Sequence, residues 1–192
     1  MKRIRDTTLE KCLERILSMH TYTYQLPLAK SSTKTIHIFN AEHEPIYTMK
    51  RTYKTIFHQL FDAWIGKFKL ICEYEGRNQN GDILVKSGVK HALIKRSESI
   101  LIMESDVFRA QIELGDMITP TYNIESKNLQ MKVTIDFNRF VQFYENGTVI
   151  AKIQLNFLNN EESELVIDER ATIQCPLFYT IYAQMFYFVG EY

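Results

Sequence analysis

The sequence predicts a mainly β protein, in which about 12 short antiparallel strands close into a barrel around a central hydrophobic C-terminal helix. Three observations predict this fold. An almost wholly apolar run lies at 175–192, and short segments of alternating polarity, separated by turn signals, fill most of the rest. Strands do not alternate with helices, which argues against a parallel sheet.

The apolar run predicts a helix that is buried on every side. Between residues 177–189 only Thr180 and Gln184 are plainly polar, and a helix without a polar face belongs inside a protein. Pro176 suits the first helical position and Gly190 suits the C-terminal cap. A strand is the competing interpretation, because Tyr, Phe, Ile and Val favour strands, but the length and both end signals favour the helix. The run is shorter than the roughly 20 apolar residues that cross a membrane, so it needs a shell of protein.

The rest of the chain supplies that shell. Period-two alternation predicts strands over residues 21–26, 36–40, 46–49, 68–74, 83–89, 92–95, 99–103, 107–114, 129–135, 140–144, 149–157 and 165–169. A longer loop is expected over 115–127, and Asn146-Gly147 is the strongest hairpin signal, since it suits a type I′ turn. Closure removes the exposed edges of the sheet. A barrel of this size is too wide for its own side chains to fill, so the apolar helix is its natural filler.

Two further helices are expected outside the barrel. Residues 4–20 carry an apolar stripe with charged residues off it, which predicts an amphipathic helix. Residues 53–66 have apolar side chains at helical spacing and end in Gly66, a C-terminal cap signal. We therefore expect 1–20 to form an N-terminal helical appendage and 21–192 to form one barrel domain with a helix near 53–65.

The formal net charge of the chain is zero, which argues against a dedicated nucleic-acid binder. The two signs are nevertheless unevenly distributed. Residues 1–46 hold 7 basic and 5 acidic side chains, residues 47–100 hold 10 and 5, and residues 101–192 hold 6 and 13. A basic middle and an acidic end would give one polar molecule with two faces, although we favour chance placement of solvated side chains.

The sequence contains no catalytic or metal-binding motif. It has no glycine-rich phosphate loop, nucleophile elbow or HExxH sequence, and its five histidines show no metal-ligand spacing with the cysteines. We therefore expect a protein that is not an enzyme and that binds no metal and no cofactor. Cys175 would lie at a helix N-terminus, where a thiol pKa is lowered in principle, but we favour a buried small residue there.

Three distant cysteines, Cys12, Cys72 and Cys175, do not make a disulfide framework. This spacing fits a reducing compartment, so we expect a cytoplasmic protein.

The most suggestive surface surrounds the helix near 53–65. Phe57, Phe61 and Trp64 lie on this helix and basic residues flank it, which is typical of a helix at a membrane interface. The candidate contacts with anionic lipid are Lys50, Arg51, Lys54, Trp64, Lys67 and Lys69. The competing interpretation, which we favour for the aromatic side chains, is that they pack on the barrel and that the lysines are ordinary surface residues.

The sequence resembles the tubby C-terminal-like proteins of bacilli, which are related to the LURP-one and phospholipid scramblase group. The resemblance rests on YTYQLPLAKSSTKTIHIFN (22–40), on YKTIFHQLFDAW (53–64) and on the apolar helix after Pro176. It covers residues 20–192 and implies the tubby-like barrel. Some animal members bind phosphoinositides, but no motif here allows their ligand residues to be carried over.

Three classes of function remain open. The leading hypothesis is a non-enzymatic module that binds anionic lipid head groups or a membrane surface, at the periphery of the membrane. The second is a protein-interaction or structural module that docks through the helix at 4–17. The third, an enzyme, would need a deep polar pocket. If the C-terminal helix fills the barrel, the interior offers no ligand cavity, and function belongs on the outer surface and loops.

Overall fold

The structure is a computed structural model that describes residues 19–27, 32–65, 72–90, 98–113, 121–136, 138–156 and 162–187. Its twelve strands are β1 (Met19–Gln25), β2 (Ile36–Phe39), β3 (Pro45–Tyr53), β4 (Cys72–Asn78), β5 (Ile83–Lys90), β6 (Glu98–Met103), β7 (Asp106–Glu113), β8 (Thr121–Glu125), β9 (Gln130–Ile135), β10 (Phe140–Glu145), β11 (Thr148–Gln154) and β12 (Glu162–Asp168). Two helices are described, α2 (Ile56–Ile65) and α3 (Pro176–Tyr187).

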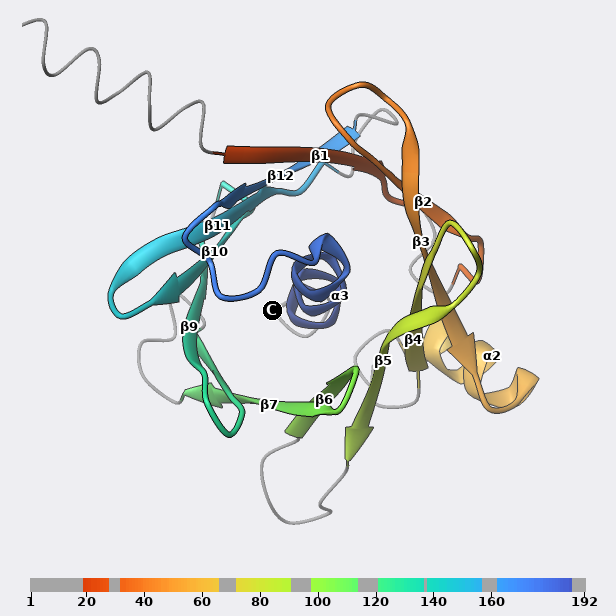
Figure 1. The fold of residues 1–192 in the computed structure, drawn as a ribbon. Coiled ribbons are helices and arrows are strands. Elements are labelled where there is room, and N and C mark those ends of the chain that lie inside the picture. The colour runs from red at the N-terminus through yellow and green to blue at the C-terminus, as the bar shows by residue number, and fades with distance from the viewer. Residues whose placement is uncertain are drawn as a thin grey trace, which may run out of the picture.

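The twelve strands form one closed antiparallel barrel (Figure 1). Each strand pairs with its neighbours in the chain, and the first strand pairs with the last, so that Met19 lies opposite Asp168 and Gln25 opposite Glu162. Closure leaves no strand of the barrel with an unpaired edge. The predicted fold class is confirmed.

The predicted central helix is confirmed as well, because α3 runs inside the barrel (Figure 1). Its side chains from Leu177 to Phe186 are all buried, including the polar Thr180 and Gln184. Aromatic rings from the barrel wall pack on it in edge-to-face and stacked arrangements, with centroids 5.0 Å apart for Phe108–Phe178, 4.9 Å for Phe143–Tyr179 and 4.0 Å for Tyr122–Phe186. The core of the protein is thus the contact between α3 and the inner face of the sheet.

Two glycines are required where they lie. A Cβ atom on Gly76 of β4 would lie 2.8 Å from Cδ2 of Leu177, so the first turn of α3 fits against the wall only where β4 has no side chain. At the β10–β11 turn, Asn146 and Gly147 have φ angles of 49° and 77°. These values match the type I′ turn predicted for this dipeptide.

The structure corrects part of the predicted strand list. The expected loop at 115–127 contains β8, in which Tyr122 and Ile124 are buried and alternate with less buried residues. Pro120 and the polar residues around it obscured this short alternation. Tyr53 ends β3 and does not belong to the following helix. The predicted strand at 92–95, residues 68–71 and the predicted helix at 4–17 lie outside the described residues.

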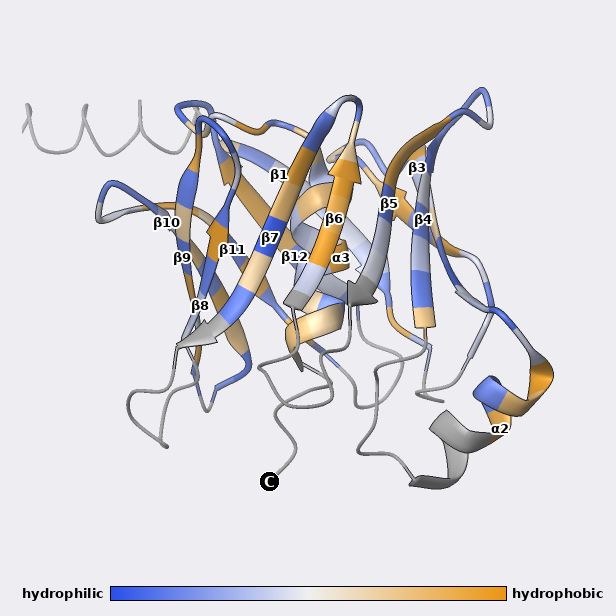
Figure 2. Cartoon of the chain, turned by 90° about the horizontal axis from the view of Figure 1, so that it is seen from below, coloured by the Kyte–Doolittle hydropathy of each residue, from blue (hydrophilic) through white to orange (hydrophobic). Residues whose placement is uncertain are grey.

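The two ends of the barrel differ in their connections. Antiparallel pairing places the short turns at 40–44, 79–82, 104–105, 126–129 and 146–147 at one end, which we call the hairpin end. The opposite end, which we call the α2 end, carries α2 between β3 and β4. Figure 2 shows the hydrophilic hairpin turns at the top and α2 beyond the strand ends at the bottom. α3 starts at the hairpin end and runs toward the α2 end.

Candidate functional site

α2 begins directly after β3 and projects beside the barrel (Figures 1 and 2). Thr55 caps its N-terminus, because the Thr55 Oγ1 atom accepts a hydrogen bond of 3.2 Å from the backbone N–H of His58. β3 is its principal contact among the barrel strands. α2 is therefore fixed at its first turn and lies outside the packed core.

The apolar side chains at the start of α2 face solvent. Phe57 is 81% exposed, Ile56 is 75% exposed and Leu60 is 61% exposed. Leu60 lies four residues after Ile56 and three after Phe57, and side chains at these two spacings are neighbours on a helix surface. The three side chains therefore form a continuous apolar face. The more polar His58 and Gln59 are half-buried. Over residues 56–60, the part of α2 whose side chains are described, this is the reverse of an ordinary surface helix, which turns its apolar stripe toward the core.

This arrangement overturns the favoured interpretation of the aromatic residues for Phe57, which does not pack on the barrel. The side chains of Phe61 and Trp64 lie outside the described residues. Sequence reasoning missed Ile56 and Leu60 as members of the exposed face. It missed them because helical spacing shows which residues share a face, but not whether that face turns inward or outward.

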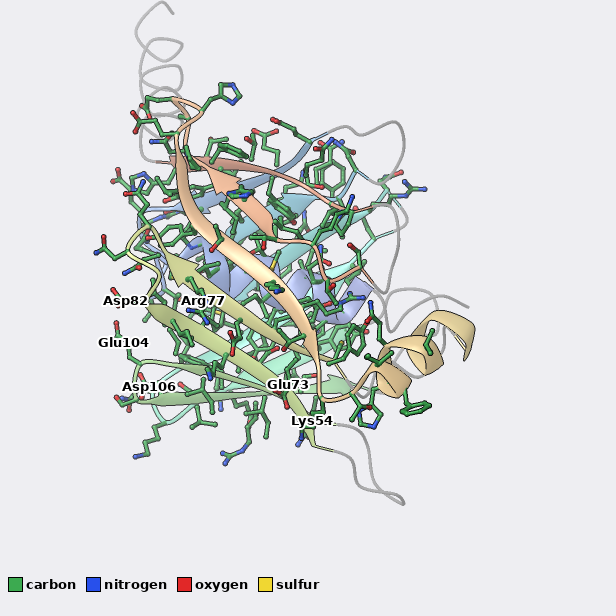
Figure 3. All side chains as sticks on the ribbon, turned by 90° about the vertical axis from the view of Figure 1, so that its right-hand side faces the viewer. Lys54, Glu73, Arg77, Asp82, Glu104 and Asp106 are labelled. Atoms are coloured by element: carbon green, nitrogen blue, oxygen red, sulfur yellow. The ribbon has the colours of Figure 1, made fainter. Side chains whose placement is uncertain are left out.

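Lys54 lies at the junction of β3 and α2, next to the apolar face. Its Nζ atom is 3.5 Å from Oε1 of Glu73, and the two side chains are 71% and 46% exposed. Figure 3 shows this pair close to the start of α2. An ion pair this exposed contributes about 0–1 kcal/mol, so Lys54 can exchange Glu73 for another anion at little cost.

Lys50 is exposed on the outer face of β3, opposite Glu75 in the register of β3 and β4. Glu75 already lies 3.0 Å from Arg77 and 3.4 Å from Lys86. Lys67 and Lys69, the other predicted lysines, lie outside the described residues.

Arg51 does not belong to this surface, which corrects the prediction. Neighbouring residues of a strand point to opposite faces, so Lys50 points outward and Arg51 points into the barrel, where it is buried. Its Nε donates a hydrogen bond of 3.0 Å to the Tyr74 hydroxyl, its Nη2 donates to the same oxygen, and its guanidinium lies over the Tyr74 ring. Arg51 thus links two neighbouring strands under α3, and the period-two rule would have excluded it from a surface site.

Cys175 precedes α3 at the hairpin end and is half-buried. Burial raises the pKa of its thiol and outweighs the backbone N–H groups of Leu177 and Phe178, which act in the opposite direction. The lowered pKa that a helix N-terminus would give is therefore not found. Among the residues that the structure describes, no group of His, Cys, Asp and Glu side chains comes together that could hold a metal ion.

No helix within the described ranges is both long enough and apolar enough to cross a membrane. In a comparison with protein families, residues 22–189 match the family described as Tubby C-terminal like domain. Comparison with curated proteins gives no match, and comparison with solved structures gives none. The family match begins within β1 and extends past the end of α3, so it covers the barrel, apart from the first three residues of β1, and its central helix.

Proposed function

Since the chain belongs to the Tubby C-terminal like domain family, we propose that it is a non-catalytic barrel module that binds an anionic membrane surface through α2. The protein would act at the periphery of a membrane in the cytoplasm. The finer relationship to tubby-like proteins of bacilli, and through them to the LURP-one and scramblase group, stays a prediction from the sequence.

One observation carries the proposal, the exposed apolar face formed by Ile56, Phe57 and Leu60. Removing a single Leu, Ile or Phe side chain from water is worth about 1.5–3 kcal/mol. Three such side chains on one outward face remain in water in the folded chain, so burying them against another surface would be favourable. A helix that inserts its apolar side at the boundary between lipid head groups and acyl chains buries such side chains.

The basic residues favour an anionic surface over a neutral one. Lys54 lies beside the apolar face and Lys50 lies on the strand that leads to it. A basic residue next to an anionic leaflet contributes about 1 kcal/mol. The interior cannot serve as the binding site in this proposal, because the side chains of α3 from Leu177 to Phe186 occupy it.

Vesicle co-sedimentation tests the proposal. We expect the protein to sediment with vesicles that contain phosphatidylglycerol, and to bind more weakly to vesicles of phosphatidylcholine alone. The double variant Phe57→Ser/Leu60→Ser should weaken binding at least about tenfold, because two apolar side chains no longer leave water. Lys54→Gln should weaken it about fivefold at low salt and less at high salt.

Matched controls lie on the barrel wall. Ile102 and Val107 are neighbours across β6 and β7 and are 45% and 38% exposed. Ile102→Ser/Val107→Ser therefore replaces two exposed apolar side chains far from α2, although it removes less apolar surface than the α2 variant does. This control should leave binding unchanged. Absence of binding to anionic vesicles at low ionic strength would overturn the proposal, and so would equal losses in the two double variants.

A further inference from the structure

Acidic side chains gather at the hairpin end of the barrel. They are Glu42, Glu44, Asp82, Glu104, Asp106 and Glu169, which we call the tip acids, and all of them are exposed. They come from four different connections, which are the turns at 40–44 and 79–82, the turn at 104–105 together with the first residue of β7, and the residues after β12. In Figure 3, Asp82, Glu104 and Asp106 lie together along one edge of the molecule, and α2 lies along the opposite edge.

Among the residues that the structure describes, basic side chains do not balance the tip acids. In the five short turns of the hairpin end, Lys127 is the only lysine or arginine. Arg77 and Arg170 lie next to these turns, but each is already close to another carboxylate, at 3.0 Å from Glu75 and 2.5 Å from Asp168. The described residues of the hairpin end therefore present a surplus of negative charge to solvent.

The length of the barrel separates this charge from α2. Strand β7 has eight residues, which at roughly 3.3 Å per residue and the usual tilt of barrel strands gives a height of about 20 Å. The screening length at physiological salt is about 8 Å. An anionic surface in contact with α2 is therefore beyond the reach of the tip acids, whereas one in contact with the hairpin end would meet them directly.

We propose that the barrel binds an anionic membrane end-on in a single orientation, with the α2 end on the lipid and the tip acids turned away from it. This inference rests on the proposed function and adds to it the geometry of the bound state. The membrane attracts the α2 end through its apolar side chains and Lys54, and its negative charge repels the tip acids at the hairpin end. The hairpin turns then stay in solvent while the protein is bound.

Tryptophan quenching by brominated phospholipid measures the orientation. The chain contains one tryptophan, Trp64, which lies within α2, and its emission should lose roughly half its intensity or more when the protein binds brominated anionic vesicles. In the variant Trp64→Phe/Ser105→Trp the reporter lies at the β6–β7 turn. At an equal bound fraction, we expect the emission of this variant to lose less than about a tenth of its intensity.

Vesicle bridging provides a second measurement. The triple variant Asp82→Lys/Glu104→Lys/Asp106→Lys gives the hairpin end an affinity for lipid, so one molecule can hold two anionic vesicles and the suspension becomes turbid. The matched control Asp82→Asn/Glu104→Gln/Asp106→Asn removes the negative charge without adding positive charge. The wild-type protein and this control should bind vesicles without turbidity, and all three proteins should melt cooperatively.

The outcomes separate the two proposals. A wild-type protein that does not bind anionic vesicles overturns the proposed function. A protein that binds, but whose tryptophan at residue 105 is quenched as strongly as Trp64, overturns the end-on orientation alone. Turbidity with the wild-type protein would do the same, because it shows that both ends attach. Strong quenching of Trp64, weak quenching at residue 105 and turbidity in the lysine variant together support the orientation.

Discussion

The two described helices have similar apolar character but opposite surroundings. In α3 every side chain from Leu177 to Phe186 is buried, and the polar Thr180 is accommodated by donating a hydrogen bond of 3.0 Å to the Pro176 carbonyl oxygen. In α2 the apolar Phe57 is among the most exposed large side chains described. Apolar composition thus determines that a helix needs a cover, whereas topology determines whether the chain itself supplies one.

The difference has a simple origin in the connections. α3 follows the strand that closes the barrel and has a continuous wall around it. α2 is inserted between two strands that are already paired with each other, β3 and β4, so it can only lie outside that wall. Ile56, Phe57 and Leu60 of α2 consequently stay in solvent, which is the observation behind the proposed membrane contact.

The largest expected effect comes from placing the same charge in each helix. Phe186→Asp should prevent folding, because an unpaired carboxylate in a dry core costs more than the few kcal/mol that stabilise a domain. Phe57→Asp should change the free energy of unfolding by no more than about 0.5 kcal/mol, since its side chain is exposed. Thermal unfolding followed by circular dichroism compares the two. A cooperative transition in the Phe186 variant would show that α3 is not the core.

Alkaline pH tests how dry the contact around α3 is. Burial raises the pKa of Tyr24, Tyr74 and Tyr179 above the ordinary value of 10.0. Above that value the unfolded chain releases these protons and the folded chain does not, so stability falls as pH rises. Each tyrosine contributes a loss of about 1.4 kcal/mol per pH unit.

Melting temperatures measured from about pH 9 to about pH 11.5, a range that spans the ordinary tyrosine pKa, would show this decline in stability. The ionised tyrosine side chain absorbs at about 295 nm. Absorbance at this wavelength should show that the three buried phenols lose their protons only when the protein unfolds. Titration of all tyrosines near their ordinary pKa in the folded protein would contradict a dry interior.

A smaller effect is expected where α3 touches the wall most closely. Gly76→Ala places a Cβ atom 2.8 Å from Leu177, and overpacking of this kind costs about 1–3 kcal/mol. Gly88 on the neighbouring strand β5 is the matched control, because a Cβ atom there meets nothing within 4 Å. Denaturant titration should show a loss for Gly76→Ala only, partly restored by adding Leu177→Ala. Equal behaviour of the two variants would mean that α3 can shift away from β4.

The smallest expected effects concern two tyrosine hydroxyls in the core, one on α3 and one on β1. The Tyr179 hydroxyl donates a hydrogen bond of 2.7 Å to the Ile173 carbonyl oxygen, whereas the buried Tyr24 hydroxyl has no hydrogen-bond partner. Tyr179→Phe should therefore lower the free energy of unfolding by about 1 kcal/mol, and Tyr24→Phe should leave it unchanged or raise it by up to about 1 kcal/mol. Denaturant midpoints measured side by side decide this, and a larger loss for Tyr24→Phe would reverse the assignment.

Much of the fold could be predicted from the sequence because its signals are local. The run from Pro176 onward has no polar face, and Asn146-Gly147 fixes a turn through its own backbone preference. β8 was missed because five residues with two buried positions give too little alternation to recognise beside a proline. The predicted strand count agrees with the structure although one predicted segment, at 92–95, lies outside the described residues.

The candidate site was only partly predictable, because it depends on which way side chains face. Lys50, Arg51 and Lys54 are adjacent in sequence, but the pleat of β3 turns Arg51 into the barrel. The uneven distribution of charge along the chain gave no indication of where the acids would gather. The tip acids come from turns far apart in sequence, and only the antiparallel order of the strands brings them to one end.

The pairing of the first strand with the last also governs how the protein can be made. Met19 meets its partner Asp168 only after every other strand exists, so a chain emerging from a ribosome cannot close the barrel until β12 has been made. α3 comes after β12, and a wall that closed before α3 arrived would shut out the helix that fills it. We therefore expect α3 to pack against the sheet before or while the barrel closes, with the slow kinetics of contacts between distant parts of a chain.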